Sequence, residues 1–291
     1  MKIIDPGLET IREATQGNLA AIDAVLLAVQ PGVFNLAVRM LGNREDAADA
    51  TQEILLKVVT HLGGFRADAA FGTWVFQVAR NHLLTAITRS NESPEVSLEG
   101  LSEHLRAGLE FGAAFSGDDA QRALTPEDKL AARQVALKRT QSMLMALDRE
   151  QRLVYVLDVV FRLSGKDAAE VVGVTPEAYR QRLTRVRGRL DAFTGSTCGL
   201  ANADAACRCE RQLPAIEHVR RSSAAAPASV ITIHPVERAE VERQFDTLVR
   251  MGDAAAIFRA HPEYRVPEAM RGAIRAVLSA EGFLSEDRGR H

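Results

Sequence analysis

Apolar residues recur at intervals of three and four along almost the whole chain, which is the spacing of amphipathic helices. Ala, Leu, Arg and Glu, which favour helices, are abundant. One short segment, residues 230–233, alternates between apolar and polar positions as a strand does. The pattern predicts an all-α protein.

Helix start and stop signals divide the first part of the chain into three or four helices. We expect one helix to end before Pro31, a second to cover residues 33–41, a third to begin after Asn43, and a fourth to form around Trp74. Together they predict a first domain over residues 1–90.

Composition changes mark the remaining boundaries. Residues 91–124 carry Ser, Gly and Asp with weak periodicity, which predicts a linker with one marginal helix. Thr125 followed by Pro126 is a helix start that opens a second domain. The predicted segments from there are a helical domain over residues 125–193, a cysteine-bearing loop and linker over 194–229, and a helical C-terminal extension over 230–291.

The second domain contains the caps, turn and apolar spacing of a helix-turn-helix. Ser164 and Asp167 cap a short helix, Gly173 supplies the turn, and Thr175 with Pro176 begins the next helix. On that second helix, a narrow apolar stripe is expected to pack on the core. The stripe consists of Tyr179, Leu183, Val186 and Leu190.

The face opposite this stripe carries side chains suited to a DNA major groove. Hydrogen-bonding side chains are directed outward, and arginines line both flanks. Such side chains contact base edges and phosphates in groove-binding helices. The predicted DNA-contacting residues are Glu177, Arg180, Gln181, Arg182, Thr184 and Arg185. A solvated basic helix in a bundle is the alternative interpretation.

The formal net charge of the 291-residue chain is only −2, so a nucleic-acid surface depends on locally concentrated arginine. The apolar run over residues 19–29 is interrupted by Asp23 and lacks a basic leader, which predicts neither a signal peptide nor a membrane span. Three closely spaced cysteines fit a reducing compartment. We therefore expect a cytoplasmic protein without a membrane partner.

Two segments resemble a known family. Region 4 of bacterial extracytoplasmic-function (ECF) sigma factors is similar to LDREQRLVYVLDVVFRLSGKDAAEVVGVTPEAYRQRLTRVRGRL. In region 2, DAADATQEILLKV resembles the helix that docks on the β′ coiled coil of RNA polymerase, and FRADAAFGTWVFQVARNHLLTAITR resembles the segment that opens the minus-ten element. The resemblance implies a sigma factor that binds core RNA polymerase and promoter DNA and directs transcription initiation.

The resemblance also implies roles for individual residues. It places Asp49, Gln52 and Glu53 on the face that binds the β′ clamp coiled coil, and their spacing puts them together on a helix. Region 4 is the part expected to meet the β flap. The positions implied near the minus-ten DNA are Arg66, Arg80, Asn81 and Arg89. Trp74 also corresponds to a position near this DNA strand. A core position is favoured over base stacking, because large aromatic side chains are usually buried.

The chain departs from the family pattern at two positions. Family members end the minus-ten segment with a run of basic residues, whereas Arg89 is the single one here, and Lys166 stands where an acidic residue is common. The first departure predicts a weaker or differently placed minus-ten contact.

Cys198, Cys207 and Cys209, with His218 further on, form a turn-rich group that can surround zinc or a similar soft cation. Three cysteines are an incomplete structural zinc site, and paired C-x2-C knuckles are absent from the sequence. Small buried thiols or a redox-labile pair are the alternatives. No cofactor is required by the resemblance.

Two other functions compete with the sigma factor. A stand-alone helix-turn-helix regulator with a metal- or redox-responsive tail needs only the second domain. An enzyme is disfavoured, because the sequence has no Gly-rich phosphate loop and no nucleophile and base in a supportive context. The C-terminal extension either replaces an anti-sigma factor by holding the DNA-binding domains silent or stabilises the fold.

Overall fold

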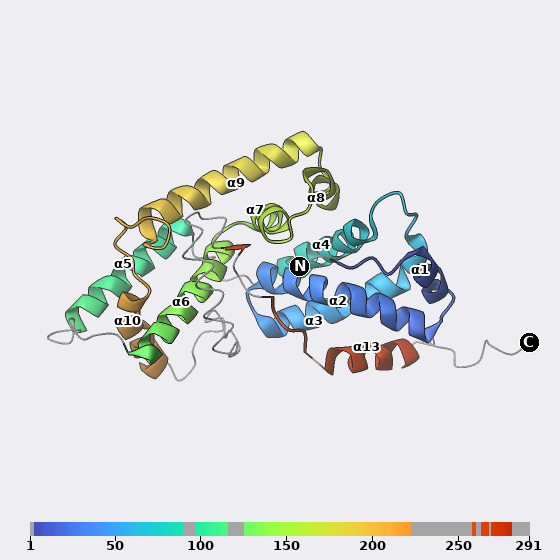
Figure 1. Cartoon of the computed structure of the whole chain (residues 1–291), viewed down its shortest axis with the longest axis horizontal. Helices are drawn as coiled ribbons and strands as arrows, with labels where there is room; N and C mark the ends of the chain where they lie inside the picture. Colours follow the sequence, from blue (N-terminus) through green and yellow to red (C-terminus); the bar gives the residue numbers. More distant parts are fainter. Residues whose placement is uncertain are drawn as a thin grey trace, which may run out of the picture. The chain divides into compact units, whose positions relative to one another are not determined.

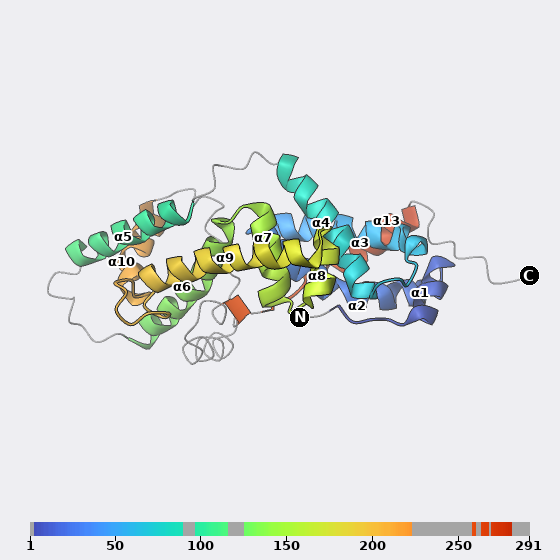
Figure 2. The same ribbon diagram turned by 90° about the horizontal axis from the view of Figure 1, so that it is seen from above.

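Every regular element in the described part of the chain is a helix, which confirms the all-α prediction. The computed structural model describes residues 3–89, 97–115, 125–222, 258–259, 263–267 and 269–280. The chain divides into two compact units, and Figures 1 and 2 show the helices in two views. The first unit contains Met1–Glu92, Val156–Tyr179 and Glu263–His291, and the second contains Ser93–Tyr155 and Arg180–Pro262.

Each unit is a bundle of helices. The first unit holds α1 (Leu8–Thr15), α2 (Leu19–Leu41), α3 (Arg44–Thr60), η1 (Leu62–Gly64), α4 (Phe71–Arg89), the π-helical turn η3 (Val156–Val160), α8 (Gly165–Val172) and α13 (Ala269–Ala280). The second unit holds α5 (Leu98–Phe115), α6 (Pro126–Met145), α7 (Arg149–Tyr155), η4 (Glu210–Gln212) and α10 (Leu213–Ser222). Helix α9 (Pro176–Thr197) begins in the first unit and continues in the second.

Side-chain caps begin the helices where the sequence indicates. The Asn43 side chain accepts a hydrogen bond from the Glu45 N–H at the start of α3, over 2.8 Å. Thr125 and Asp128 form a reciprocal capping box at the start of α6, with Pro126 in the first turn. These bonds satisfy backbone donors that a helix start leaves open.

Helix α2 runs unbroken through Pro31, so the prediction of two helices separated at this proline is wrong. A proline inside a helix removes one backbone hydrogen bond and costs about 3 kcal/mol. Val29, Val33 and Leu36 are completely buried around it, and each buried side chain of this size contributes about 1.5–3 kcal/mol. Burial in the core therefore outweighs the break. The helix is apolar enough to cross a membrane, but 72% of its most apolar window lies inside the fold, as in a core helix.

The segment predicted as a linker with one marginal helix contains α5, an 18-residue helix. Leu98, Leu101 and Leu105 are buried on one side of it, and α5 packs against α10 and α6. The helix is stabilised by these tertiary partners, because in proteins most helical stability comes from packing of the apolar face.

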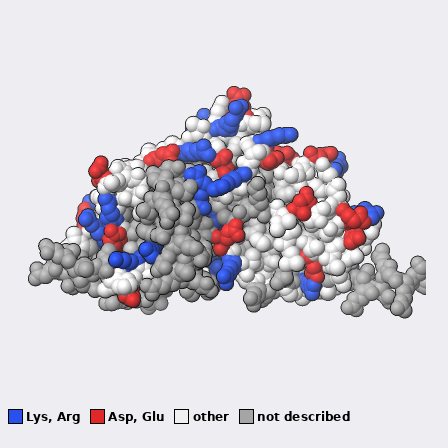
Figure 3. Space-filling view, viewed as in Figure 1, with Lys and Arg blue, Asp and Glu red and all other residues white. Residues whose placement is uncertain are grey.

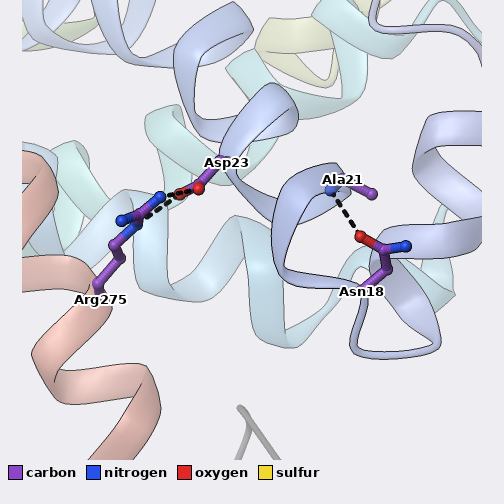
Figure 4. A network of polar contacts seen from close by, with 4 residues as sticks. All are labelled: Asn18, Ala21, Asp23 and Arg275. Atoms are coloured by element: carbon purple, nitrogen blue, oxygen red, sulfur yellow. Dashed lines mark hydrogen bonds and ion pairs between the residues drawn. The ribbon is translucent and has the colours of Figure 1, made fainter. Parts of the chain in front are cut away.

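Part of the C-terminal extension lies on the first unit. The Asn35 amide nitrogen donates to the Tyr264 carbonyl over 3.0 Å, and the Tyr264 N–H donates back to the Asn35 side-chain oxygen over 2.8 Å. The Arg39 guanidinium lies 5.1 Å from the centre of the Tyr264 ring. At another position on α2, Asp23 forms an ion pair with Arg275 of α13 (Figure 4). Residues 230–233 and the linker from residue 223 lie outside the described residues.

Asn35→Ala should lower the free energy of unfolding of the first unit by about 2–3 kcal/mol, because it removes both hydrogen bonds between the Asn35 side chain and the backbone of Tyr264. Trp74 is the one tryptophan of the chain and lies in this unit, so its fluorescence during urea unfolding reports on this unit. The exposed Asp68→Ala, in the loop before α4, is the control, with an expected change within about 0.5 kcal/mol. Equal unfolding midpoints for both variants would contradict the role of Asn35.

Candidate nucleic-acid interface

The helix-turn-helix forms as its sequence predicts. Ser164 accepts a hydrogen bond from the Asp167 N–H over 3.1 Å at the start of α8. Gly173 ends α8 with a φ of 75°, which glycine adopts without the penalty of a side chain. Thr175 then caps α9 by accepting from the Ala178 N–H over 3.2 Å.

One stripe of α9 is buried along three turns. Tyr179, Leu183, Val186 and Leu190 are each at most 9% exposed, as predicted from their spacing. Burial of four large side chains fixes the rotation of the helix about its own axis. The polar and basic side chains of α9 therefore face away from the core.

Four basic or hydrogen-bonding side chains are exposed on α9 among the predicted DNA contacts. These are Arg180, Gln181, Thr184 and Arg185, and Glu177 is exposed in the first turn. The Thr184 hydroxyl donates to the Arg180 carbonyl over 2.9 Å, so its oxygen remains available as an acceptor. Figure 3 shows Lys and Arg side chains, with carboxylates beside them, over the part of the molecule where α8 and α9 lie in Figure 1.

One arginine flank of α9 is held by α7. The Arg182 Nη1 lies 2.9 Å from the Glu150 Oε2, and the Arg189 Nη1 donates to the Gln151 Oε1 over 2.5 Å. Arg182 must therefore exchange a carboxylate for a phosphate if it contacts DNA. Sequence reasoning missed Glu150 and Gln151, because these residues lie on a different helix.

A hollow of about 800 Å³ lies between α3 and α4 in the first unit. It brings together Asp49 and Glu53, predicted for polymerase binding, and Asn81, predicted for minus-ten DNA. Asp49, Glu53 and Asn81 are exposed, whereas Gln52 is half-buried and does not line the hollow.

The hollow also contains a charged cluster of Glu53, Lys57 and His82 that the sequence did not predict. The Lys57 Nζ lies 2.9 Å from the His82 Nδ1. The His82 Nδ1 also lies 3.7 Å from the Glu53 Oε2. Glu53 and Lys57 are four residues apart on α3 and so share a face. That spacing was the available signal, but the pairing with α4 was not visible in the sequence.

Trp74 is part of an aromatic cluster and also lines the hollow. Its ring centre lies 5.8 Å from that of Phe65 and 6.0 Å from that of Phe71. Phe71 is buried, but Trp74 is only partly buried. The indole thus packs on the core with one side and borders the hollow with another.

The remaining predicted minus-ten residues lie apart. Arg66 is exposed in the loop before α4. Arg80 donates to the Asn81 side chain over 2.9 Å, and its guanidinium lies beside Gly173 at the end of α8. The Arg80 Nε is buried without a hydrogen bond among the described residues. The side chain of Arg89 lies outside the described residues.

The cysteine loop folds back on the end of α9. The Gly199 N–H donates to the Cys207 carbonyl over 3.0 Å, and the three thiols are free. Burial raises the pKa of Cys207, and burial also raises the pKa of Cys209 to about 12. The ring of His218 packs on Phe111 in a tilted arrangement, with ring centres 4.8 Å apart. Among the described residues, no group of three His, Cys, Asp or Glu side chains is arranged to hold a metal ion, so the zinc site stays a prediction.

Comparison with known families matches both helical regions. The family model of sigma-70 region 2 matches residues 26–92, and that of sigma-70 region 4 matches residues 137–190. The two regions follow one another in the order that sigma-70 proteins have. The fold and the site therefore define a protein of the sigma-70 class.

Individual relatives give the subfamily. The RNA polymerase sigma-H factor of Pseudomonas aeruginosa is 26% identical over 187 residues, which are 63% of this chain and 91% of the relative. The ECF RNA polymerase sigma factor SigW of Bacillus subtilis is 24% identical over 180 residues, 62% of this chain and 92% of the relative. The RNA polymerase sigma factor CnrH of Cupriavidus metallidurans is 29% identical over 183 residues, 62% of this chain and 90% of the relative. The chain is therefore similar to RNA polymerase sigma factors, ECF members among them, across both matched regions.

The matched regions end at residue 190, before the cysteine loop.

Because a thiolate and not a thiol is the nucleophile, the raised pKa predicts that iodoacetamide alkylates Cys209 slowly at pH 8 and faster as the pH rises toward 12. Peptide mass spectrometry of the alkylated protein measures each cysteine separately. The urea-unfolded chain is the control, in which Cys209 should react as an ordinary thiol. Equal rates at pH 8 in the folded and unfolded chains would contradict the buried, neutral thiol.

Proposed function

We propose that this chain is the promoter-specificity subunit of RNA polymerase: it binds core polymerase and directs promoter recognition and transcription initiation. The observation that carries the proposal is the presence of region 2 and region 4 in one chain and in that order. A relative aligned over most of its own length is named as an RNA polymerase sigma factor. The protein acts by binding, and it works in the cytoplasm, where polymerase and promoters are.

Region 2 supplies the polymerase contact in this proposal. Asp49 and Glu53 are exposed on α3, so their carboxylates can pair with basic groups on the β′ clamp coiled coil without rearrangement of the core. The separated minus-ten strand is then bound by Asn81, Arg66 and the exposed side of Trp74. Amides, cations and aromatic rings can contact unstacked bases and phosphates.

Region 4 supplies the second promoter contact. Helix α9 enters the major groove of the minus-thirty-five element, with Gln181 and Thr184 toward base edges and Arg180 and Arg185 toward the backbone. The same region meets the β flap of the polymerase. Arginine contacts to phosphate release counterions, so this binding weakens as salt rises.

A stand-alone regulator is the weaker candidate, because it needs the helix-turn-helix alone and gives the region 2 match no role. An anti-sigma factor remains a suitable partner. In the described part of the extension, α13 packs on α3 but leaves Asp49 and Glu53 exposed, so α13 does not mask these carboxylates.

Run-off transcription with purified core polymerase and a matching promoter tests the proposal, because a stand-alone regulator yields no product without another sigma factor. Replacing both Asp49 and Glu53 by Ala should weaken core binding about tenfold, since each exposed ion pair contributes about 0.7 kcal/mol, and should lower run-off product in parallel. The matched control replaces Glu9 and Glu13, two carboxylates with the same spacing on α1. Absence of core binding by the wild-type chain would refute the proposal.

Arg185→Ala should lower the salt slope of DNA binding by about one, because the lost contact is to a phosphate. Arg182→Ala is the internal comparison and should change affinity less, because its guanidinium is already paired with Glu150. Fluorescence anisotropy of a labelled duplex across a series of KCl concentrations measures both slopes. A slope for Arg185→Ala equal to that of the wild type would contradict the phosphate contact.

A further inference from the structure

The second unit contains a cavity that the sigma factor activity does not use. It has a volume of about 320 Å³ and lies between one face of α6, Leu105 of α5, and the loop that follows α9. A cavity of this size is at the lower end of small-molecule sites. The cavity lies beyond the region 4 match on its loop side, because the loop begins after residue 190.

The lining of the cavity is mostly apolar. Ala132, Ala136 and Met143 of α6 are buried along it, and Leu200 of the loop completes the apolar part. All three cysteines also line it. Burial raises the pKa of Cys207 and Cys209, so these thiols are neutral near pH 7 and behave as small apolar groups.

One charged side chain in this lining has no acceptor among the residues that the structure describes. Arg139 projects from α6, and burial lowers the pKa of its guanidinium. Within the part of the chain that the structure describes, Arg139 makes no hydrogen bond or ion pair. The Arg139 side chain is partly buried, and a partly desolvated cation without an acceptor gains from a counter-charge. The cavity as it stands therefore favours an anion.

The other charged residues of the lining strengthen this preference. Lys129, Arg133 and Arg208 add positive charge, and Glu210 is the one carboxylate among the lining residues. Arg208 is occupied by backbone carbonyls, including that of Ala203 over 2.5 Å. Arg139, in contrast, keeps hydrogen-bond donors open toward the apolar part of the cavity, as far as the described residues go.

We propose that this cavity binds a small organic anion with an apolar body, whose carboxylate or equivalent group pairs with Arg139. The apolar body lies against Ala132, Ala136 and Met143, and the neutral thiols border it. Thr197 and Cys198, at the end of α9, also line the cavity. A bound ligand therefore contacts the DNA-recognition helix itself.

Isothermal titration calorimetry of the full chain tests the site, with octanoate as the probe and EDTA present to remove metal ions. Octanoate should bind at least about tenfold more tightly than octanol, because a hydrogen bond to a charged group contributes about 1.5–3 kcal/mol. Octylammonium should not bind. Arg139→Gln should weaken octanoate binding by at least about tenfold. Arg106→Gln, at an exposed arginine of α5, is the control and should bind as the wild type does.

Three results would overturn the proposal. They are absence of octanoate binding to the wild type, equal binding by Arg139→Gln and the wild type, and equal affinity for octanol and octanoate. Circular dichroism establishes that the variant is folded. If Arg139→Gln does not fold, alkylation of the wild type decides the matter. At pH 8, where the thiols are neutral and octylammonium is a cation, octanoate but not octylammonium should slow the alkylation of Cys207 and Cys209, and equal rates with both probes refute the site.

Discussion

The buried stripe of α9 is the constraint on which the DNA-binding surface depends. Tyr179, Val186 and Leu190 are almost fully buried, and each such side chain contributes about 1.5–3 kcal/mol. The exposed Arg182–Glu150 ion pair contributes about 0–1 kcal/mol. Apolar burial therefore decides which way α9 is turned, and the arginines take the positions that remain. Their orientation follows from the core and does not require the charges to attract one another.

The sequence predicted those parts of the fold that depend on local chemistry. The caps at Asn43, Thr125 and Ser164 and the turn at Gly173 use bonds within a few residues, so their signals are local. The unbroken helix at Pro31 was not predictable, because its cost is offset by core contacts made far along the chain. The full length of helix α5 was not predicted, for the same reason. Its apolar periodicity is weak, and its leucines are buried by partners on α6 and α10.

The candidate site likewise combines features that local sequence predicts with features that depend on tertiary packing. Exposure of Arg180, Gln181 and Arg185 followed from helical spacing alone. Engagement of Arg182 by Glu150 did not, because it depends on how α7 packs on α9. For the cysteines, spacing suggested ligands or small thiols without distinguishing them, and burial of Cys209 is what raises its pKa to about 12. Charge state is a property of the packed environment, which a sequence pattern does not contain.

Two buried arginines, Arg39 and Arg152, differ from the partly buried Arg139 of the cavity in the acceptors that surround them. Arg152 is buried and donates to the carbonyls of Leu144, Met145 and Leu147, so the charge joins α7 to the end of α6. Arg39 is buried and has Asn35 and the Tyr264 ring as partners. Both satisfy the rule that a buried cation needs acceptors around it. Arg139 lines a cavity of apolar groups and neutral thiols, with no such acceptor among the described residues. The missing acceptor is the property that an anionic ligand supplies.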